Sequence, residues 1–555
     1  MDTITVYCKN LERKEELPIG TTLESIAQRY CSELGFTALN CRVNNQTFSL
    51  AEKLYEPAEL YFSGISEESG QRTYVRTLSF VMSKAAYDVI PNVKVHVLHS
   101  LSNGYYCTIQ NQENITAEQL AQIKRRMDEL IAMNLPFEAH TVPAEEASQL
   151  FRRMGMQDKV DLIETAGQLY YTYYTLDDYC DSYYGSLTPS TGYLYLYDLI
   201  PCNGGGVLMR VPDMKNPRQL APLVEQPKLR KLIAQQTRLL TTLNLQSIGA
   251  LNRAVENKSD VEMIQVSEAV QEKEIAAIAS TIAERYTDGV RIILVSGPSS
   301  SGKTTFSKRL RTQLITNFLH PYSISLDDYF VNREYTPRDD SGEYDYESIY
   351  ALDLETFNKD LSALLRGEEV RIPTFDFTLG KRIYKGNTLQ LKEGDLLLLE
   401  GIHALNPLLI PSIPPNATFK IYVSALTAVS LDGHNRIPST DNRLLRRLVR
   451  DYRYRNYSAI ETLRRWPSVR RGEEKWVFPH QEEADAMFNS AMMYELAILR
   501  RYAEPILREV PQNVPEYGEA QRLLRFLEQI NFISARTLPP ISLLREFVGG
   551  SSFKY

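Results

Sequence analysis

The first 62 residues show two kinds of hydrophobic pattern in succession. The stretch "TITVYC" alternates apolar and polar positions like a half-buried strand, whereas "GTTLESIAQRY" repeats its apolar residues at helical spacing. Thr21 and Glu24 have the spacing of a capping box, which predicts where that helix begins. "CRVNNQTFSL" has the pattern of two strands joined by an Asn-Asn turn. Together these elements predict a small β-grasp module over residues 1–62.

Residues 63–225 show the pattern of a second, mixed unit. "VKVHVLHS" and "GYYCTIQ" are typical of strands, and "ITAEQLAQIKRRMDELIAMNLP" has apolar residues at helical spacing. Thr116 and Gln119 form a capping box at its start. The tyrosine-rich stretch that follows could stack nucleic-acid bases, but strands packed at the edge of a core are the more common explanation. We therefore expect an α+β domain here.

The remaining chain divides into three parts. Residues 228–287 contain no proline and repeat apolar positions at helical spacing, so residues 226–287 are expected to form a connector of two or three helices. In residues 288–505, apolar strands ("VRIILVSG", "YSISL", "DLLLLEG", "FKIYVSA") alternate with helices. That alternation predicts an α/β domain with a parallel sheet. Residues 506–555 are expected to be a helical extension.

Composition narrows the class of protein. The chain has 555 residues, which is too many for one hydrophobic core. Its net charge of −7 argues against a general nucleic-acid binder, and no apolar run reaches the ~18 residues of a membrane span. The N-terminus lacks the order of a signal peptide. Six cysteines (Cys8, Cys31, Cys41, Cys107, Cys180 and Cys202) include no C-x-x-C pair, so we expect a reducing, cytoplasmic location.

The stretch "GPSSSGKTT" carries the most specific chemical signal. It follows an apolar strand, precedes a helical pattern and fits the phosphate-binding loop Gly-x4-Gly-Lys-Thr. Backbone N–H groups of such a loop and the following helix N-terminus attract phosphate oxygens, the lysine reaches the β- and γ-phosphates, and the threonine hydroxyl ligates Mg²⁺. The residues expected at the nucleotide are Gly297, Ser299, Ser300, Ser301, Gly302, Lys303, Thr304 and Thr305.

Acidic residues follow two of the other predicted strands. "YSISLDDYF" ends its strand at Asp327 and Asp328, and "DLLLLEG" ends at Glu400. Because strand carboxyl ends face the ligand crevice of a doubly wound sheet, Asp327 is expected to orient and deprotonate an acceptor hydroxyl. Glu400 is expected to hold Mg²⁺ together with Thr304. For Asp328, an ordinary turn residue explains the sequence equally well.

An arginine-rich stretch lies further along the same domain. Residues 443–475 contain eleven Arg or Lys and four Asp or Glu. On a mobile helical segment, these arginines would close over a triphosphate and neutralise its charge, which predicts a lid. A solvated basic face or a nucleic-acid patch is the alternative. No guanine-reading "NKxD" element is present, which argues against a GTPase.

Taken together, these motifs resemble the uridine kinase and phosphoribulokinase family over residues 290–505. "GPSSSGKTT", "SLDDYF", "GEYDYE", "RIPTFDF", "LLLLEGIHALNP" and "RLLRRLVRDYRYR" carry the resemblance. It implies a P-loop kinase that uses ATP and Mg²⁺ to phosphorylate a sugar hydroxyl, in nucleoside kinases the ribose 5′-hydroxyl. It further implies Asp327 as general base, Asp345 at the ribose, Tyr344 and Phe375 at the base, and Arg450 and Arg455 in the lid. Tyr329 and Arg382 complete the expected substrate site.

Three positions depart from this family pattern. Gly380 stands where uridine kinases commonly have a base-reading histidine, Phe330 replaces a tyrosine, and an arginine of the lid is missing near Tyr457. A site without those hydrogen-bond partners discriminates poorly between bases.

The front half has a second resemblance. Residues 1–62 resemble a TGS-type β-grasp module, and residues 63–225 resemble the editing domain of threonyl-tRNA synthetase, mainly through "HSLSNGYYCTI" and "ITAEQLAQIKRRMDEL". That domain uses an HxxxH pair, but here the corresponding helix "TLSFVMSKAAYDVIP" has no histidine. We therefore expect an inactive domain, retained for binding or regulation.

The sequence thus predicts an ATP-dependent kinase that phosphorylates the 5′-hydroxyl of a uridine- or cytidine-like nucleoside. Two alternatives remain: a kinase of another sugar or sugar phosphate, or a regulatory ATPase whose front half grips tRNA. The acidic balance disfavours a nucleic-acid partner, no membrane association is expected, and the sequence leaves a homo-oligomer open.

Overall fold

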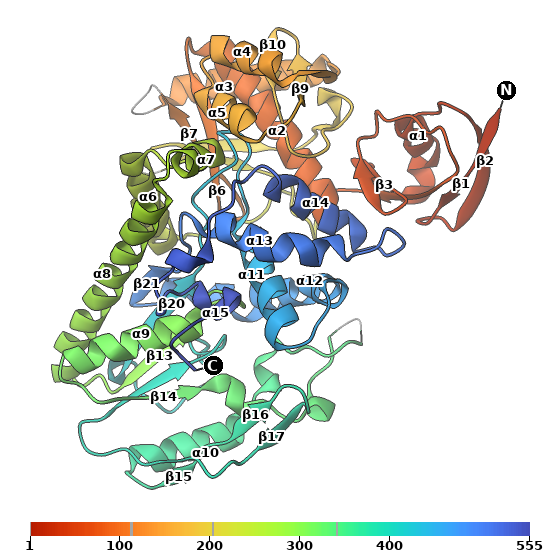
Figure 1. The fold of residues 1–555 in the computed structure, drawn as a ribbon. Helices are drawn as coiled ribbons and strands as arrows, with labels where there is room; N and C mark the ends of the chain where they lie inside the picture. Colours follow the sequence, from red (N-terminus) through yellow and green to blue (C-terminus); the bar gives the residue numbers. More distant parts are fainter. Residues whose placement is uncertain (1, 111–114, 203–204, 340–341, 555) are drawn as a thin grey trace.

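A computed structural model describes residues 2–110, 115–202, 205–339 and 342–554. The largest parallel sheet has five strands. Figure 1 shows it with its helices in the lower part of the molecule and a second α+β unit above it. The N-terminal region up to about residue 63 forms a separate lobe to one side, and the long helices α6 (Pro227–Leu243) and α8 (Asp260–Thr287) run along the opposite side. None of the helices in this described part is long and apolar enough to cross a membrane.

The first lobe is the expected β-grasp arrangement. Its elements are β1 (Thr3–Cys8), β2 (Arg13–Pro18), α1 (Leu23–Leu34), β3 (Asn40–Val43), β4 (Gln46–Phe48) and β5 (Ala58–Ser63). The strand order is β2-β1-β5-β3-β4, with β1 and β5 parallel and the other pairs antiparallel. Asn44 and Asn45 both have positive φ and make the predicted tight turn.

The predicted start of α1 is wrong by one residue. The N-cap is Thr22, whose hydroxyl accepts a hydrogen bond from the backbone N–H of Ser25. The Thr21 hydroxyl instead donates to the carbonyl oxygen of Pro18 at 2.6 Å. Either of the two adjacent threonines suits an N-cap. Because Thr21 is bonded to the end of β2 at Pro18, Thr22 becomes the N-cap.

The second unit contains two antiparallel sheets, β10-β9-β8 and β11-β12-β7-β6. Its strands are β6 (Lys94–Leu101), β7 (Gly104–Gln110), β8 (Glu138–Pro143), β9 (Tyr170–Leu176), β10 (Tyr179–Asp181), β11 (Asp198–Pro201) and β12 (Val207–Arg210). Its helices are α2 (Glu68–Val89), α3 (Ala117–Ala132), α4 (Ala144–Arg153) and α5 (Gln157–Thr165). The Thr116–Gln119 capping box is present. Tyr171, Tyr179 and Tyr183 are buried, which confirms that the tyrosine stripe mainly packs a core.

The connector consists of three helices, α6 (Pro227–Leu243), α7 (Ile248–Glu256) and α8 (Asp260–Thr287). Helix α8 packs along α9 (Lys303–Thr316), and buried side chains of all three connector helices share one continuous core with the five-stranded sheet. The connector is therefore part of the same packed body as the sheet.

The large sheet has the order β14-β19-β13-β20-β21, and every neighbouring pair is parallel. Its strands are β13 (Ile292–Ser296), β14 (Pro321–Ser325), β19 (Leu396–Glu400), β20 (Thr418–Ser424) and β21 (Ala486–Asn489). Alternate residues of β13 face opposite sides: Ile293 and Val295 join the core with α8 and α9, whereas Ile292 and Leu294 join the core with α10 (Leu354–Leu365). The fold is thus the expected α/β class. The sequence analysis missed β21.

Further elements frame the carboxyl end of this sheet. They are the hairpin pairs β15 (Val370–Arg371) with β18 (Thr388–Leu389) and β16 (Thr374–Asp376) with β17 (Lys381–Ile383), and the helices α11 (Ser439–Tyr454), α12 (Ala459–Trp476), α13 (Glu495–Arg508), α14 (Tyr517–Leu527) and α15 (Arg545–Val548). Helix α11 packs against α12, α13 and α15. The arginine-rich stretch is therefore helical, as predicted.

A buried charged cluster joins the second unit to the loop before α11. The ammonium group of Lys159 lies 2.9 Å from Asp181 and 3.0 Å from Asp432, and all three side chains have at most 1% exposure. His434 lies 2.7 Å from Asp181. Although burial alone would lower the pKa of Lys159, Asp181 and Asp432 raise it well above its usual value. The ion pairs therefore hold the two units together through buried charge.

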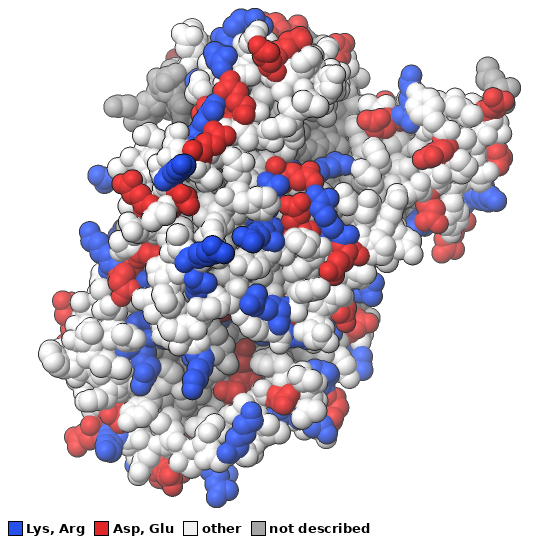
Figure 2. Space-filling view, viewed as in Figure 1, with Lys and Arg blue, Asp and Glu red and all other residues white. Residues whose placement is uncertain are grey.

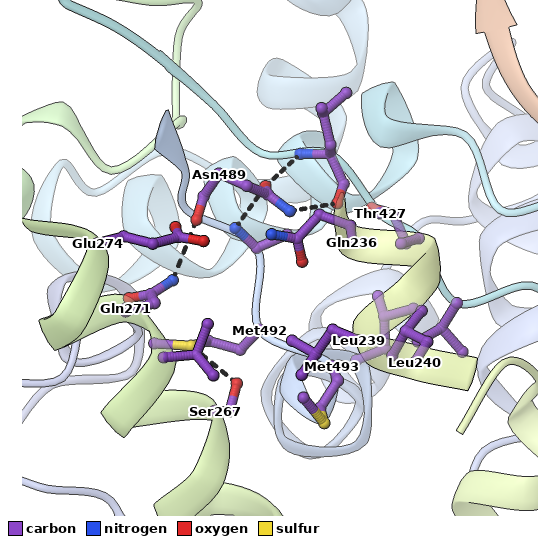
Figure 3. A pocket seen from close by; sticks show the side chains of 16 residues that line it. Gln236, Leu239, Leu240, Ser267, Gln271, Glu274, Thr427, Asn489, Met492 and Met493 are labelled. Atoms are coloured by element: carbon purple, nitrogen blue, oxygen red, sulfur yellow. Dashed lines mark hydrogen bonds between the residues drawn. The ribbon is translucent and has the colours of Figure 1, made fainter. Parts of the chain in front are cut away.

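A small cavity of about 30 Å³ lies between α6, α8 and β21. Figure 3 shows Gln271 and Glu274 of α8 facing Asn489, whose carbonyl oxygen accepts a hydrogen bond from the Gln271 side chain. Glu274 forms no ion pair within the described residues, and burial raises the pKa of its carboxyl to about 7. The space is too small for anything but water-sized molecules.

Glu274→Gln should stabilise the protein at neutral and alkaline pH. The raised pKa of the folded state means that native stability is present at acid pH and is lost as the pH rises through about 7, because the buried carboxyl must then ionise. At ~1.4 kcal/mol per pKa unit, the gain approaches about 3 kcal/mol at pH 8 and is much smaller at pH 5. Melting temperatures at the two pH values measure it.

The control is Glu284→Gln, which changes an exposed carboxylate on the same helix. Its effect on the melting temperature should be small at both pH values. An equal gain from both variants would show that net charge, and not the burial of Glu274, sets the pH dependence.

Candidate functional site

The loop between β13 and α9 needs glycine at two positions. A side chain on Gly297 would put its Cβ 2.0 Å from the carbonyl oxygen of Val423, and the residue has φ of 157°. Gly302 has φ of 83°, and a Cβ there would lie 2.4 Å from a methyl group of Leu543. Both positions therefore exclude larger residues, and the backbone curls tightly before the first turn of α9.

Lys303 and Thr304 begin α9 beside the end of β19. The Lys303 ammonium donates to the carbonyl oxygen of Pro298 at 3.2 Å, so the lysine folds back over the loop. The Thr304 hydroxyl donates to Glu400 at 3.4 Å. Burial raises the pKa of Glu400 to about 7, with the nearby Asp327 and Glu546 carboxylates adding to this effect and Lys303 opposing it. The structure thus brings together the two residues expected at a metal.

Asp327 follows β14 in the short 3-10 turn Leu326–Tyr329. It is half-buried, and its charge acts on Glu400, Arg450 and Arg455. Asp328 has a structural role, because it accepts a hydrogen bond from the backbone N–H of Phe375 at 3.1 Å and so fixes β16. Of these two neighbouring aspartates, Asp327 thus lies among the charged groups of the candidate site, whereas Asp328 supports β16.

Glu347 is an acidic group that the sequence analysis missed. It is buried, and burial raises the pKa of its carboxyl to about 7, with Arg447, Glu473, Lys303 and Asp327 as its charged neighbours. Nothing in its local sequence, "DYESI", distinguishes it from a surface glutamate. Only the packing of its segment against α12, where Gly472 lies against its Cβ, brings it to the site.

Three arginines of the arginine-rich stretch share a single aspartate. Asp451 lies 3.2 Å from Arg447, 2.8 Å from Arg450 and 3.7 Å from Arg455. The positive charge of Arg450, followed by burial, lowers the pKa of Arg455 to about 10. The group therefore has more positive than negative charge, and it faces the side of the site where Asp327 lies. Such a cluster attracts an anion.

Glu473 ties the arginine-rich helices to the loop. It is fully buried on α12 and accepts hydrogen bonds from the Ser299 backbone N–H at 2.9 Å and from both terminal nitrogens of Arg443. Arg446 is equally buried and pairs with Glu495. Arg443 and Arg446 are thus held in structural ion pairs, and the Arg447 side chain instead donates to the hydroxyl of Ser299 at 2.8 Å.

The residues expected at the acceptor are only partly together. Phe375 packs with Phe330 and Phe377, and Arg455 lies over the ring of Phe377 at 4.8 Å, which connects this aromatic group to the arginine cluster. Tyr344 packs against Arg338 at 4.5 Å.

Three further residues that were expected to contact the substrate make other contacts in the structure. Asp345 accepts from the backbone N–H of Glu347. Arg382 pairs with Asp353 at 2.8 Å. Tyr329 points into the core, with 1% exposure and its hydroxyl bonded to Asp360, so it supports the site without facing it.

A residue from the far end of the chain also lies at the loop. The Glu546 carboxylate, on α15, accepts hydrogen bonds from the Thr305 backbone N–H at 3.2 Å and the Thr305 hydroxyl at 2.6 Å. Figure 2 shows the molecule hollowed here, with acidic side chains inside the hollow and Lys and Arg around it, between the part that carries α10 and the part that carries α9.

This geometry can be compared with known proteins. Residues 292–497 match the Phosphoribulokinase / Uridine kinase family. The match starts at β13, contains the loop, Asp327, Glu400 and the arginine cluster, and ends within α13. This part of the chain therefore has the fold of a P-loop kinase.

The N-terminal region is similar to proteins of another kind. It matches the threonine–tRNA ligase of Carboxydothermus hydrogenoformans, 24% identical over 190 residues that cover 34% of this chain and 30% of the ligase. It also matches the threonine–tRNA ligase of Syntrophotalea carbinolica, at 29% identity over 199 residues that cover 34% and 31%. The chain thus spans about a third of the length of these curated relatives.

Solved structures were also compared. A possible uridine kinase from Bacillus stearothermophilus is 18% identical, with 39% of this chain and 98% of that chain covered and a TM-score of 0.28. A putative fructose transport system kinase from Silicibacter sp. TM1040 covers the same shares at 18% identity, with a TM-score of 0.27.

Glu473→Gln should destabilise the kinase-like part. Removing this charge leaves Arg443 buried beside a neutral group, which costs about 3–5 kcal/mol for a buried ion pair. A lower melting temperature in differential scanning calorimetry measures the loss. Its neighbour Glu474 is half-exposed, so Glu474→Gln should change stability by less than about 0.5 kcal/mol. Equal melting temperatures for the two variants would contradict this assignment.

Proposed function

We propose that the protein is a kinase that transfers the γ-phosphoryl group of ATP to a hydroxyl group of a small molecule, and that the preferred acceptor is the 5′-hydroxyl of a nucleoside. The observation that carries the proposal is the convergence on one loop of Lys303, the Thr304–Glu400 pair and an arginine cluster with a single aspartate. Phosphoryl transfer depends on positioning and charge neutralisation, which this arrangement supplies.

The residues at the loop fit a magnesium ion. No cluster of three His, Cys, Asp or Glu side chains within the described residues is arranged to hold a metal. Thr304 and Glu400 offer two oxygen ligands, which suits Mg²⁺ because it commonly takes one or two protein oxygens and completes its shell with phosphate and water. Bound there, Mg²⁺ would neutralise charge on the β- and γ-phosphates.

Asp327 is the proposed general base. It lies at the carboxyl end of β14, within the electrostatic reach of Glu400 and Arg450. A carboxylate in this position accepts the proton of the acceptor hydroxyl as the hydroxyl attacks the γ-phosphorus, and Arg450 and Arg455 neutralise charge on the transferring group. Lys303 holds the β- and γ-phosphates in line.

The aromatic residues support a nucleoside acceptor. Phe375 and Phe377 lie at the edge of the arginine cluster and offer ring faces and edges to a planar base. A sugar or sugar phosphate has no planar group for these rings. A panel of nucleosides and ribulose-type sugars separates the two classes of acceptor.

Asp327→Asn should lower the turnover number by about 10²–10⁴-fold, because the amide cannot accept the hydroxyl proton. ATP affinity should change little, since the carboxylate faces the acceptor. ADP formation with uridine, cytidine and a ribulose-type sugar gives the rate, and calorimetry with an unreactive ATP analogue gives the affinity.

Glu393→Gln is the matched control, because Glu393 is exposed in the turn before β19, at the opposite end of that strand from Glu400. It should leave turnover unchanged. Wild-type rates in Asp327→Asn would refute the base assignment, and turnover with ribulose-type sugars alone would refute the nucleoside acceptor.

A further inference from the structure

A large cleft lies between the front half and the arginine-rich helices, away from the loop. Its volume is about 790 Å³, within the range of small-molecule sites. One wall is α2 with the β-grasp lobe, and the other consists of α11, α12 and α14. Hydrogen bonds and an ion pair join the walls: the Asn45 side chain donates to the carbonyl oxygen of Gln512, the Gln512 side chain donates to the carbonyl oxygen of Asn44 at 3.5 Å, and Arg72 pairs with Glu519 at 3.1 Å. In Figure 2, charged side chains gather where Figure 1 places α2 beside α14.

The cleft has more positive charge than its carboxylates neutralise. Arg72 and Arg522 form a network with Glu68, Glu519 and Asp441, which makes two cations and three anions. Outside that network, five cationic side chains that line the cleft form no ion pair with any residue in the described ranges: Arg42, Arg76, Lys215, Arg436 and Arg525. Arg42 and Arg76 lie on the first wall, and Arg525 lies on the second. Lys215 lies in the stretch after β12, and Arg436 lies in the loop before α11.

Arg76 is the most unusual of these. It lies mid-helix in α2, and the carbonyl oxygen of Ser186 accepts its one assigned hydrogen bond. Its guanidinium lies against Gly185, where even a methyl group would not fit. Burial, followed by the like charges of Arg72 and Arg522, lowers the pKa of Arg76. Keeping an arginine partly buried without a carboxylate partner costs folding free energy, unless a bound anion supplies the counter-charge.

We propose that this cleft binds a small phosphorylated molecule that carries at least two negative charges. Guanidinium groups pair bidentately with phosphate oxygens, and cations on both walls suit a ligand with charge along its length. Because the ligand would contact α2 and α14 at once, it would bridge the front half and the helices that pack on the arginine cluster. This inference does not depend on the loop being a nucleotide site.

The probe is inorganic tripolyphosphate, titrated calorimetrically into the full chain carrying Lys303→Ala so that the loop does not contribute. We expect one binding site per chain. Adding Arg76→Gln, or separately Arg525→Gln, should weaken binding at least tenfold, whereas Arg238→Gln, an exposed change on α6, should leave it unchanged.

Three outcomes would overturn the proposal: no binding of tripolyphosphate, binding that neither cleft variant weakens, or binding of structured RNA in the absence of tripolyphosphate binding. Arg525 lies at the edge of the cleft on α14, so its variant remains informative even if Arg76→Gln fails to fold.

A separate observation concerns Glu546. Phosphate loops hold their nucleotide partly through the backbone N–H groups at the start of the following helix, and in this structure the Glu546 carboxylate bonds to one of them, that of Thr305. Leu543 and Phe547 on either side are fully buried, and Phe547 packs under Arg446. The tail is therefore fixed, and its carboxylate lies where a phosphate group would bind.

We infer that Glu546 is an internal competitor of the nucleotide, an inference that rests on the proposed function. A nucleotide phosphate and this carboxylate repel each other and share the same donors, so the glutamate side chain must turn away when the nucleotide binds. Because only the side chain has to move, the buried leucine and phenylalanine anchors stay in place. Glu546 would then set the ATP concentration at which the site fills.

Glu546→Gln and Glu546→Ala should each bind ATP and ADP at least fivefold more tightly than the wild type, measured by calorimetry on the full chain. Glu528→Gln, which changes an exposed carboxylate after α14, is the control and should bind like the wild type. Unchanged or weaker nucleotide binding in both Glu546 variants would overturn the inference alone. Failure of every protein, wild type included, to bind nucleotide would refute the loop assignment and this inference with it.

Discussion

The candidate site depends on how the protein neutralises arginines that it buries. Glu473 accepts from Arg443 and from the Ser299 backbone N–H, so a single carboxylate fixes the arginine-rich helices and the loop relative to each other. Without it, the guanidinium group of Arg443 would be buried without a counter-charge, and the loop would lose a hydrogen bond at its turn. The remaining arginines, Arg447, Arg450 and Arg455, share Asp451 instead.

The front half is connected to this arrangement through buried charge. Lys159 comes from the second unit, and Asp432 comes from the loop that leads into α11, the helix that carries Arg443 to Arg450. Separating the halves would take Asp432 away from the Lys159 ammonium group and His434 away from Asp181. Helix α5 is therefore tied by buried charge to the loop that leads into α11.

Sequence reasoning succeeded where the signal is local. The strands of the parallel sheet are short apolar runs followed by turn residues, and the loop motif is contiguous, so both could be located without a structure. It failed where the signal depends on distant contacts. Glu473 and Glu546 lie 174 and 241 positions from the loop residues that they contact, and no pattern connects them.

The remaining misses follow from side-chain direction. The resemblance implied that Tyr329 faces a substrate, but a short 3-10 turn directs it into the core to Asp360. Arg443 and Arg446 share the composition of the lid arginines, but they face Glu473 and Glu495 and are neutralised. Composition gives the number of arginines in a helix, but only the structure shows which carboxylate each of them pairs with.

The excess of positive charge around Asp451 explains why carboxylates gather at the same place. One aspartate cannot neutralise three guanidinium groups, and in this structure the Asp327 and Glu546 carboxylates lie close enough to act on them. Under the proposed function, a triphosphate with its magnesium ion would replace these side-chain carboxylates as the counter-charge of the arginine cluster.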